Sequence, residues 1–188
     1  MGIIKVDELT GITGDGGPSS PITFSGDTIT KFNAPTGHVI QTLGIMQPEV
    51  DTTTSQILDD DTIPQITEGK EAFSLAITPS NANNKLLIHA FCGCISSDTN
   101  NRRNMFALFK NSENNAIAAC YTDFQAAGTG EQSVDLTHFM TAGTTLEITF
   151  RVRFGSDGTG TTTLNGTSGN RRFGGVMATG MTIQEIAG

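Results

Sequence analysis

Hydrophobic and polar residues alternate with a period of two over several stretches of the chain. The longest alternation is "LEITFRVRF", whose apolar side chains all fall on one face: Leu146, Ile148, Phe150, Val152 and Phe154. Successive side chains of a β-strand point to opposite faces, so this stretch predicts a strand with one face in a core. The segment "EAFSLAIT" repeats the pattern with Phe73, Leu75 and Ile77 and predicts a second such strand.

A strand, a turn and another strand are predicted by "ITPSNANNKLLIHA". Pro79 removes a donor from the sheet and ends the first strand, and residues 80–84 are turn-forming. The second strand, "KLLIHAFCGCI" at 85–95, is apolar on both faces. We therefore expect a partner subunit or an inner sheet to cover it on both sides. The side chains predicted for the subunit interface are Leu87, His89, Phe91 and Ile95.

The remaining pattern also favours strands. The segments "HVIQTLGIM" and "QSVDLTHFM" predict two more, and "KNSENN" between two apolar segments predicts a hairpin. The last strand is expected in "FGGVMATGMTIQEIA", with Met177, Met181 and Ile183 on one face. This gives about eight to ten strands, a number typical of a sandwich or barrel. No helical stripe interrupts them, so we predict an all-β domain over residues 37–188.

Residues 1–36 differ from the rest of the chain. They are rich in Gly, Pro, Ser, Thr and Asp, and a segment of this composition buries too little apolar surface to form a core. It is either a flexible arm or an extended arm ordered by a partner, and regularly spaced apolar residues favour the second. The residues predicted to attach this arm are Ile3, Ile4, Val6, Leu9, Ile22 and Phe24.

Composition and charge exclude several partners. The net charge of −8 argues against nucleic-acid binding, which needs a clustered positive surface. No apolar run approaches the ~18 residues of a membrane helix, so we predict no membrane partner. The first residues lack the layout of a secretion signal. The cysteine count is three, and an odd number fits synthesis in a reducing cytoplasm better than a disulfide framework.

Histidine and cysteine chemistry is sparse. A catalytic triad would have to use His38, His89 or His138, but the chain has no G-x-S-x-G or other nucleophile motif. His89 and His138 fall within strand patterns, where a structural role is expected. Cys92 and Cys94 lie two apart and lack the second pair that a zinc site needs, so buried free thiols are expected.

Oxygen-rich loops are candidates for cations or carbohydrate. "DDDT" at 59–62 and "GSDGTG" at 155–160 do not have EF-hand spacing and are interpreted as solvated loops, so we predict no metal and no cofactor. Asn165 begins a formal glycosylation sequon. Asp135 and Glu147 are the carboxylates considered for glycan cleavage, which requires a defined separation between the two.

Several segments together resemble small structural proteins of tailed bacteriophages, many of them from marine and cyanobacterial viruses. "SLAITPSNANNKLLIHA" resembles their "ITP…SKILI" element, and "FALFKNSENNAIAA" is similar to their hairpin. Residues 144–188 resemble their closing pattern, in which a "Y-K-V-R" strand leads to an "iNg" turn and ends in "T-i-x-E-I". The opening "GIIKVDELTG" resembles their "KVD-T-I" start. Thr145 or Leu146 stands where the family often has Tyr, and residues 113–115 stand where a Gly is common.

The resemblance implies a virion component with a jelly-roll-like antiparallel β-sandwich, commonly trimeric, preceded by an extended N-terminal arm. The leading hypothesis is a non-enzymatic short fibre, appendage or capsid decoration subunit. It would be made in the host cytoplasm, and residues 1–36 would either attach it to other capsid or tail proteins or entwine the subunits of the trimer. The alternative is a module that binds host glycans through loops 96–104 and 155–172. A third, less favoured hypothesis is a glycan-degrading enzyme that uses Asp135 and Glu147.

Overall fold

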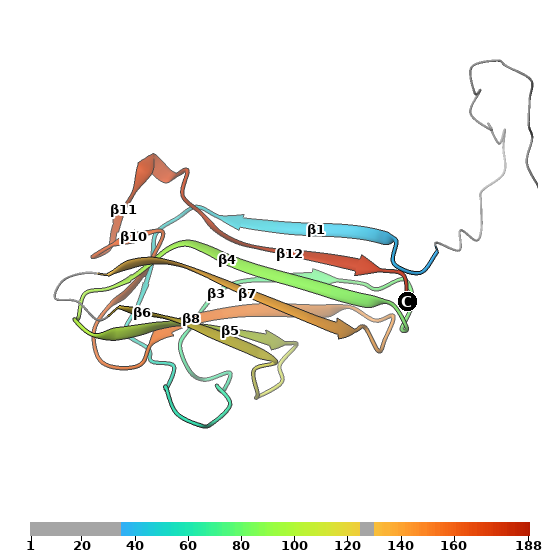
Figure 1. Ribbon diagram of the computed structural model, residues 1–188, viewed down its shortest axis with the longest axis horizontal. Coiled ribbons are helices and arrows are strands. Elements are labelled where there is room, and N and C mark those ends of the chain that lie inside the picture. The colour runs from blue at the N-terminus through green and yellow to red at the C-terminus, as the bar shows by residue number, and fades with distance from the viewer. Residues whose placement is uncertain (1–34, 125–129) are drawn as a thin grey trace, which may run out of the picture. The chain divides into compact units, whose positions relative to one another are not determined.

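Two antiparallel sheets face each other in the computed structural model, which describes residues 35–124 and 130–188 (Figure 1). In the first sheet, called sheet A, the order is β1-β12-β4, and β7 pairs with the other edge of β4. The long strands of sheet A are β1 (Val39–Gln47), β12 (Thr179–Ile186), β4 (Lys85–Ser97) and β7 (Glu131–Thr141).

The second sheet, called sheet B, has the order β3-β8-β5-β6. Its strands are β3 (Lys70–Ile77), β8 (Ile148–Ser156), β5 (Arg102–Lys110) and β6 (Ala118–Phe124). The chain crosses between the two sheets repeatedly, and eight strands in this order form a jelly roll. The prediction of an all-β, jelly-roll-like antiparallel β-sandwich is therefore confirmed. Residues 1–34 of the predicted arm, with all six of its apolar residues, lie outside the described residues, which begin at Pro35.

Short elements that the sequence did not predict lie between β8 and β12. β9 pairs with β2 and with the last residues of β4, β10 pairs with β11, and a 3₁₀ turn follows. The unpredicted elements are β9 (Thr162–Leu164), β10 (Gly166–Thr167), β11 (Asn170–Arg171) and η1 (Phe173–Gly175). β2 (Asp51–Thr53) is an edge strand at the start of residues 51–67, whose polar and acidic pattern predicts an edge strand and a loop. β12 begins only at Thr179, so Met177 precedes the strand in which it was predicted.

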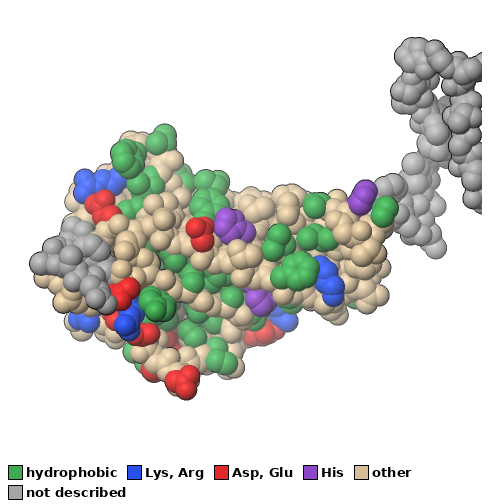
Figure 2. Space-filling model, in the orientation of Figure 1, with side chains coloured by type: hydrophobic (Ala, Val, Ile, Leu, Met, Phe, Trp, Pro, Cys, Tyr) green, Lys and Arg blue, Asp and Glu red, His purple; other side chains and the backbone are tan. Residues whose placement is uncertain are grey.

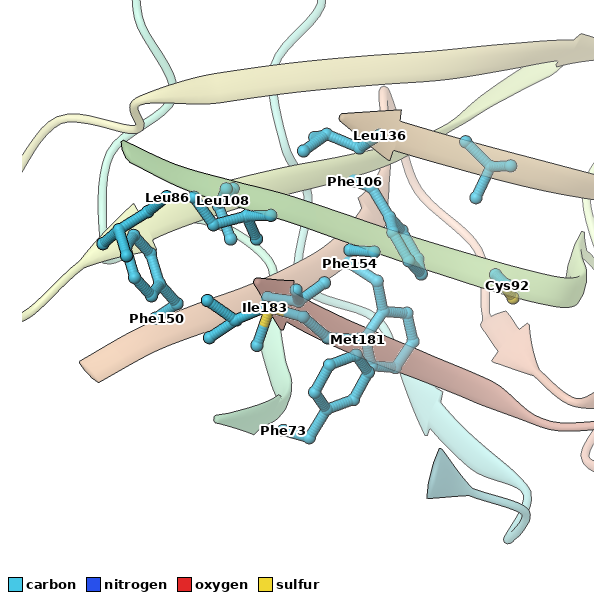
Figure 3. Close-up of a cluster of buried hydrophobic side chains, with 14 of the residues drawn as sticks. Phe73, Leu86, Cys92, Phe106, Leu108, Leu136, Phe150, Phe154, Met181 and Ile183 are labelled. Atoms are coloured by element: carbon cyan, nitrogen blue, oxygen red, sulfur yellow. The ribbon is translucent and has the colours of Figure 1, made fainter. Parts of the chain in front are cut away.

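The core between the sheets is built mainly from phenylalanine and branched aliphatic side chains (Figure 3). The alternation of β8 was predicted correctly for four residues, since Ile148, Phe150, Val152 and Phe154 are each at most 1% exposed. Full burial of such a side chain stabilises the fold by about 1.5–3 kcal/mol. The prediction was wrong for Leu146, which is 75% exposed because β8 begins after it.

Residues 55–69 of the β2–β3 connection cover the outer face of sheet B over β5. Ile57 joins Met105, Ala107 and Phe109 in a second buried cluster on that side. The backbone is tied down as well, since Ile57 N donates to Ser156 O at 3.1 Å. β5 therefore has core on both faces, and its residues 105–109 are each 6% exposed or less. The doubly covered strand of this chain is β5, whereas the sequence pattern favoured β4.

Asn165 is a buried junction between several strands. Its Nδ2 donates to Gln47 O at 2.7 Å and to Glu49 O at 2.9 Å, and its Oδ1 accepts from Thr179 Oγ1 at 2.9 Å. Its backbone N donates to Cys94 O at 2.8 Å, and its φ is 59°. Asn adopts positive φ more readily than most residues. The amide of the formal sequon is thus fully buried and used inside the fold.

Glu185 is a fully buried carboxylate at the opposite end of β12. It accepts hydrogen bonds from Asn84 Nδ2 at 2.6 Å, from Gln41 Nε2 at 2.6 Å, and from Ser80 N and Oγ at 2.8 Å each. Burial opposes ionisation, but the bonds from Asn84, Gln41 and Ser80 outweigh burial and hold the pKa of Glu185 below its ordinary 4.5. The carboxylate therefore fastens the last strand to the β3–β4 turn.

We predict that Glu185→Gln lowers the free energy of unfolding at pH 7 by about 3 kcal/mol, because a neutral amide accepts fewer of these bonds. The folded-state pKa of Glu185 is depressed, so its contribution is complete above 4.5 and is lost as the pH falls through the lower folded-state value. Urea unfolding of parent and variant should therefore converge as the pH falls below 4.5. The exposed Glu49→Gln should change stability by less than about 0.5 kcal/mol. A constant difference between the parent and Glu185→Gln at every pH would contradict this account.

Candidate functional site

The outer face of sheet A carries a hollow at the middle of three adjacent strands. In the register of β12, β4 and β7, Thr182 lies opposite His89, which lies opposite Thr137. In the next row Gln184, Leu87 and Phe139 are aligned in the same way. The hollow has a volume of about 350 Å³ and is lined by Leu87, His89, Thr137, Thr182 and Gln184. One of its lining side chains, that of Leu87, is apolar, and the other four are polar.

Large apolar side chains border this hollow on the same face. Phe139 is 57% exposed and Met46 is 60% exposed. Phe91 is half-buried, because its ring lies across Gly180: a Cβ at Gly180 would stand 2.9 Å from Phe91 Cζ and 2.8 Å from Met46 Sδ. An antiparallel sheet that faces only water has mainly polar outward side chains. Apolar residues gathered here are therefore typical of an interaction surface.

Three of the four predicted interface residues lie on this face. Leu87 and Phe91 are half-buried, and the side chain of His89 is 46% exposed. The prediction was wrong for Ile95, which is fully buried in the core. The register of β4 against β7 shifts between Cys92 and Ile95, where a bulge inserts one extra residue. The bulge reverses which face the following side chains occupy.

His89 is paired with a carboxylate on the neighbouring strand. Its Nε2 lies 3.2 Å from Asp135 Oδ1, and its ring centroid lies 5.7 Å from that of Phe91. The Asp135 side chain is 68% exposed. An exposed His–Asp pair beside apolar rings can supply polar contacts to a second protein surface.

The carboxylates considered for glycan cleavage do not form a site together. Asp135 lies in β7, six residues before Thr141, which ends the strand. Six residues of strand span roughly 20 Å. Glu147 is beyond that end, directly before β8 of sheet B. Paired glycosidase carboxylates stand about 5–10 Å apart, so Asp135 and Glu147 do not have the geometry of such a pair.

The other histidines and the cysteines are not gathered into a site. His38 is exposed ahead of β1, and burial lowers the pKa of His138. Burial raises the pKa of Cys92 to about 11 and that of Cys120 to about 11, and it also raises the pKa of Cys94. Within the described ranges, no three His, Cys, Asp or Glu side chains are grouped so that they could hold a metal ion. The described residues also include no helix with the length and apolarity to cross a membrane.

A polar hollow lies at the end of the sandwich, among the loops first considered for glycan binding. Asn101, Arg103, Asp123 and Asp157 line this space of about 390 Å³. Arg103 Nε lies 3.7 Å from Asp123 Oδ2, and its guanidinium also pairs with Asp59 and lies 5.5 Å from the centre of the Tyr121 ring. The hollow therefore offers carboxylate, amide and guanidinium groups side by side.

The two oxygen-rich loops are held by local hydrogen bonds. Asp60 Oδ1 accepts from Thr62 N at 2.8 Å and from the Thr62 hydroxyl, which lowers the pKa of Asp60. In the second loop, Asp157 Oδ1 accepts from Arg103 N at 3.3 Å. Asp60 thus shapes a turn, as Asp commonly does, whereas Asp157 joins its loop to the start of β5.

Two surface features were missed by the sequence analysis. Phe173 and Val176 are 74% and 87% exposed on the η1 turn, although they were assigned to a strand. Phe139 also projects outward from β7 (Figure 2 shows how hydrophobic side chains are distributed on one face). Each feature had a signal in the sequence. Gly174 and Gly175 indicate a turn after Phe173. In the alternation of β7, Val134 and Leu136 point into the core, so residue 139 falls on the outward face.

Comparison with known proteins identifies fold similarity only. No family model matches the chain, and no curated protein matches it in sequence. Among solved structures, it is similar to the dimeric latent PorU from Porphyromonas gingivalis (TM-score 0.35, 10% identity), covering 82% of this chain and 14% of that chain. It is also similar to Eiger TNF from S. frugiperda (TM-score 0.40, 7% identity), covering 78% of this chain and 93% of that chain. The chain thus spans a small part of the PorU chain.

We predict that the native protein resists thiol modification. Cys92 and Cys94 are buried, and a thiol with a raised pKa is protonated and unreactive near pH 8. Iodoacetamide should modify these two residues about tenfold or more slowly in the native protein than in urea. Peptide mapping by mass spectrometry would locate the label, and Cys120→Ser would remove the half-buried third thiol from the count. Rapid native labelling of Cys92 would show that the core opens.

Proposed function

We propose that the chain is a non-enzymatic structural subunit on the exterior of a tailed-phage virion, either a short fibre or appendage or a capsid decoration subunit. In this proposal it is a homotrimer whose subunits meet through the outer face of sheet A. It is made in the host cytoplasm, and residues 1–36 attach it to other capsid or tail proteins. The proposal combines the resemblance of several segments to phage structural proteins with the surface of sheet A.

The observation that carries the proposal is the apolar border of the sheet A hollow. Met46, Leu87, Phe91 and Phe139 come from three strands and lie on one face, where an antiparallel sheet that faces water commonly carries polar side chains. Thr182, His89 and Thr137 form a polar row between the apolar side chains, with groups that can exchange hydrogen bonds across an interface. Subunit contacts combine apolar packing with such hydrogen bonds.

The segments that resemble the phage proteins have structural tasks in this fold. The "ITP" element forms the β3–β4 turn, and the "T-i-x-E-I" ending contributes Glu185, which binds that turn. The turn resembling "iNg" contains the junction residue Asn165. These shared positions support an architecture in common with the phage structural proteins. From that architecture we propose the role on a virion.

We expect the full-length protein to sediment at three times the mass of one chain. Leu87→Ser combined with Phe139→Ser should raise the dissociation constant about tenfold for each substitution, because both remove apolar area from the proposed contact. Leu146→Ser is the matched control, since this residue is 75% exposed but precedes β8. A strict monomer at all accessible concentrations would overturn the trimer.

The virion assignment has a separate readout. An antibody raised against residues 37–188 and labelled with gold should decorate intact particles at the head or at the tail. Particles that carry no label, while the unassembled protein in the same lysate is labelled, would overturn the assignment.

A second candidate function, binding of host glycan, is favoured by the polar hollow of Asn101, Arg103, Asp123 and Asp157. Carboxylate, amide and guanidinium groups hydrogen-bond to sugar hydroxyls. If the hollow binds glycan, the protein should retain specific sugars on a glycan array, and Asp123→Ala should abolish this retention. Asp135→Asn, an exposed aspartate on sheet A, serves as the control. An array without any binding would remove this candidate.

A further inference from the structure

Residues 171–176, at the end of β11 and in the turn that follows it, form a projection called here the knob. Its exposed apolar side chains are Phe173 and Val176. These side chains are 74% and 87% exposed. Three consecutive residues have left-handed backbone angles, with φ of 47° at Phe173, 64° at Gly174 and 95° at Gly175. A phenylalanine in this region is strained, and strain retained at an exposed site is typical of a functional one.

The base of the knob is fixed to the body of the protein. Val176 N donates to Phe173 O at 3.2 Å, and Arg172 N donates to the carbonyl of the buried Asn165 at 3.4 Å. Arg172 also pairs with Glu131 at 2.9 Å. The two exposed apolar side chains are therefore presented on a defined turn, which lowers the entropic cost of burying them in a complex.

The knob carries positive charge. Arg171 and Arg172 directly precede Phe173, and Figure 2 shows basic side chains beside the hydrophobic ones on the projection at the upper left. Glu131 compensates Arg172, whereas Arg171 has no carboxylate partner among the described residues. A surface that receives the knob would need apolar area next to an uncompensated negative charge.

Such a surface exists between residues 57–64 and strand β6, and it is called here the 57–64 hollow. It consists of two adjoining depressions of about 220 and 420 Å³, which share Asp60, Thr62, Pro64 and Ala119. Its exposed apolar side chains are Leu58 (48%), Ile63 (53%) and Tyr121 (58%).

The charge of the 57–64 hollow is negative. Asp59 is compensated by Arg103, but Asp60 and Asp61 have no cationic partner in the part of the chain that the structure describes. Both are exposed. The hollow therefore combines apolar area and uncompensated carboxylates, which complement the apolar side chains and the free guanidinium of the knob.

One chain cannot bring the two surfaces together. In Figure 1 the η1 turn stands at the upper edge of the sandwich, and the β2–β3 connection lies at the lower edge. The strands between them are held in two hydrogen-bonded sheets. A contact between the knob and the hollow therefore requires two molecules.

We propose that the knob of one copy docks into the 57–64 hollow of a second copy of this chain. Phe173 and Val176 would pack against Leu58, Ile63 and Tyr121, and Arg171 would pair with Asp60 or Asp61. This contact joins two different surfaces, so it is heterologous and either closes a ring or continues as a filament. It does not use the outer face of sheet A and does not depend on the proposed function.

The contact can be tested by cross-linking full chains that each carry one accessible thiol. Cys120→Ser is present in every chain, because the half-buried Cys120 lines the hollow, and the other native thiols, at 92 and 94, are buried. On this background, a Val176→Cys chain mixed with an Ile63→Cys chain should form a disulfide-linked heterodimer under mild oxidation. A Leu146→Cys chain replaces Ile63→Cys as the control, since Leu146 is also exposed but lies outside both surfaces. The expected result is a heterodimer yield about tenfold or more above this control.

Charge reversal tests the same contact without any new thiol. Arg171→Glu or Asp61→Arg alone should raise the dissociation constant about tenfold, and a mixture of the two chains should regain association. Phe173→Ser with Val176→Ser should abolish it while the thermal unfolding midpoint stays unchanged. Equal cross-linking with the Leu146→Cys control, or unchanged association in these variants, would overturn the proposal.

Two outcomes separate this proposal from its alternatives. If the knob binds a different virion protein and no second copy, the second-copy partner is wrong. The double variant Leu87→Ser with Phe139→Ser tests the sheet A interface, and cross-linking of Val176→Cys with Ile63→Cys tests the knob contact. If the double variant leaves the oligomer intact while the two cysteines cross-link, the sheet A interface is wrong and the knob contact stands.

Discussion

The structure depends on how β12 is held at its two ends. This strand pairs with β1 on one side and with β4 on the other, so sheet A would separate without it. At its start, the hydroxyl of Thr179 bonds to the buried Asn165, and at its end the buried Glu185 accepts bonds from the β3–β4 turn. Both anchors are polar groups inside the protein, where an unmade hydrogen bond costs more than a made one contributes. Burial of the hydrophobic core stabilises the packing of the two sheets, and Asn165 and Glu185 fix the register of β12.

The regular parts of the fold were predictable because period-two alternation identifies a buried strand face directly. The inward residues of β8, the β3–β4 turn at Pro79 and the β5–β6 hairpin all follow from local patterns. The burial of β5 on both faces was not predictable, because it depends on the distant residues 55–69. A sequence pattern shows that a face is apolar but does not show what covers it.

The candidate site was partly predictable for a related reason. Leu87, His89 and Phe91 were placed on the correct face of β4, whereas Ile95 was not, because a one-residue bulge has no signature in the alternation. The role of Asn165 was hidden in a formal sequon, since burial is needed to distinguish a structural amide from an acceptor. Phe173 was assigned to the last strand, and this prediction was wrong, because its positive φ cannot be inferred from its residue type.

The two broad surfaces of the sandwich differ in how far they are covered. Residues 55–69 pack over β5 on the outer face of sheet B, whereas the outer face of sheet A is open in the described part of the chain. Copies that meet through their sheet A faces therefore keep residues 55–69 away from that contact. The depressions beside residues 57–64 then stay accessible, so the two proposed contacts are compatible within one assembly.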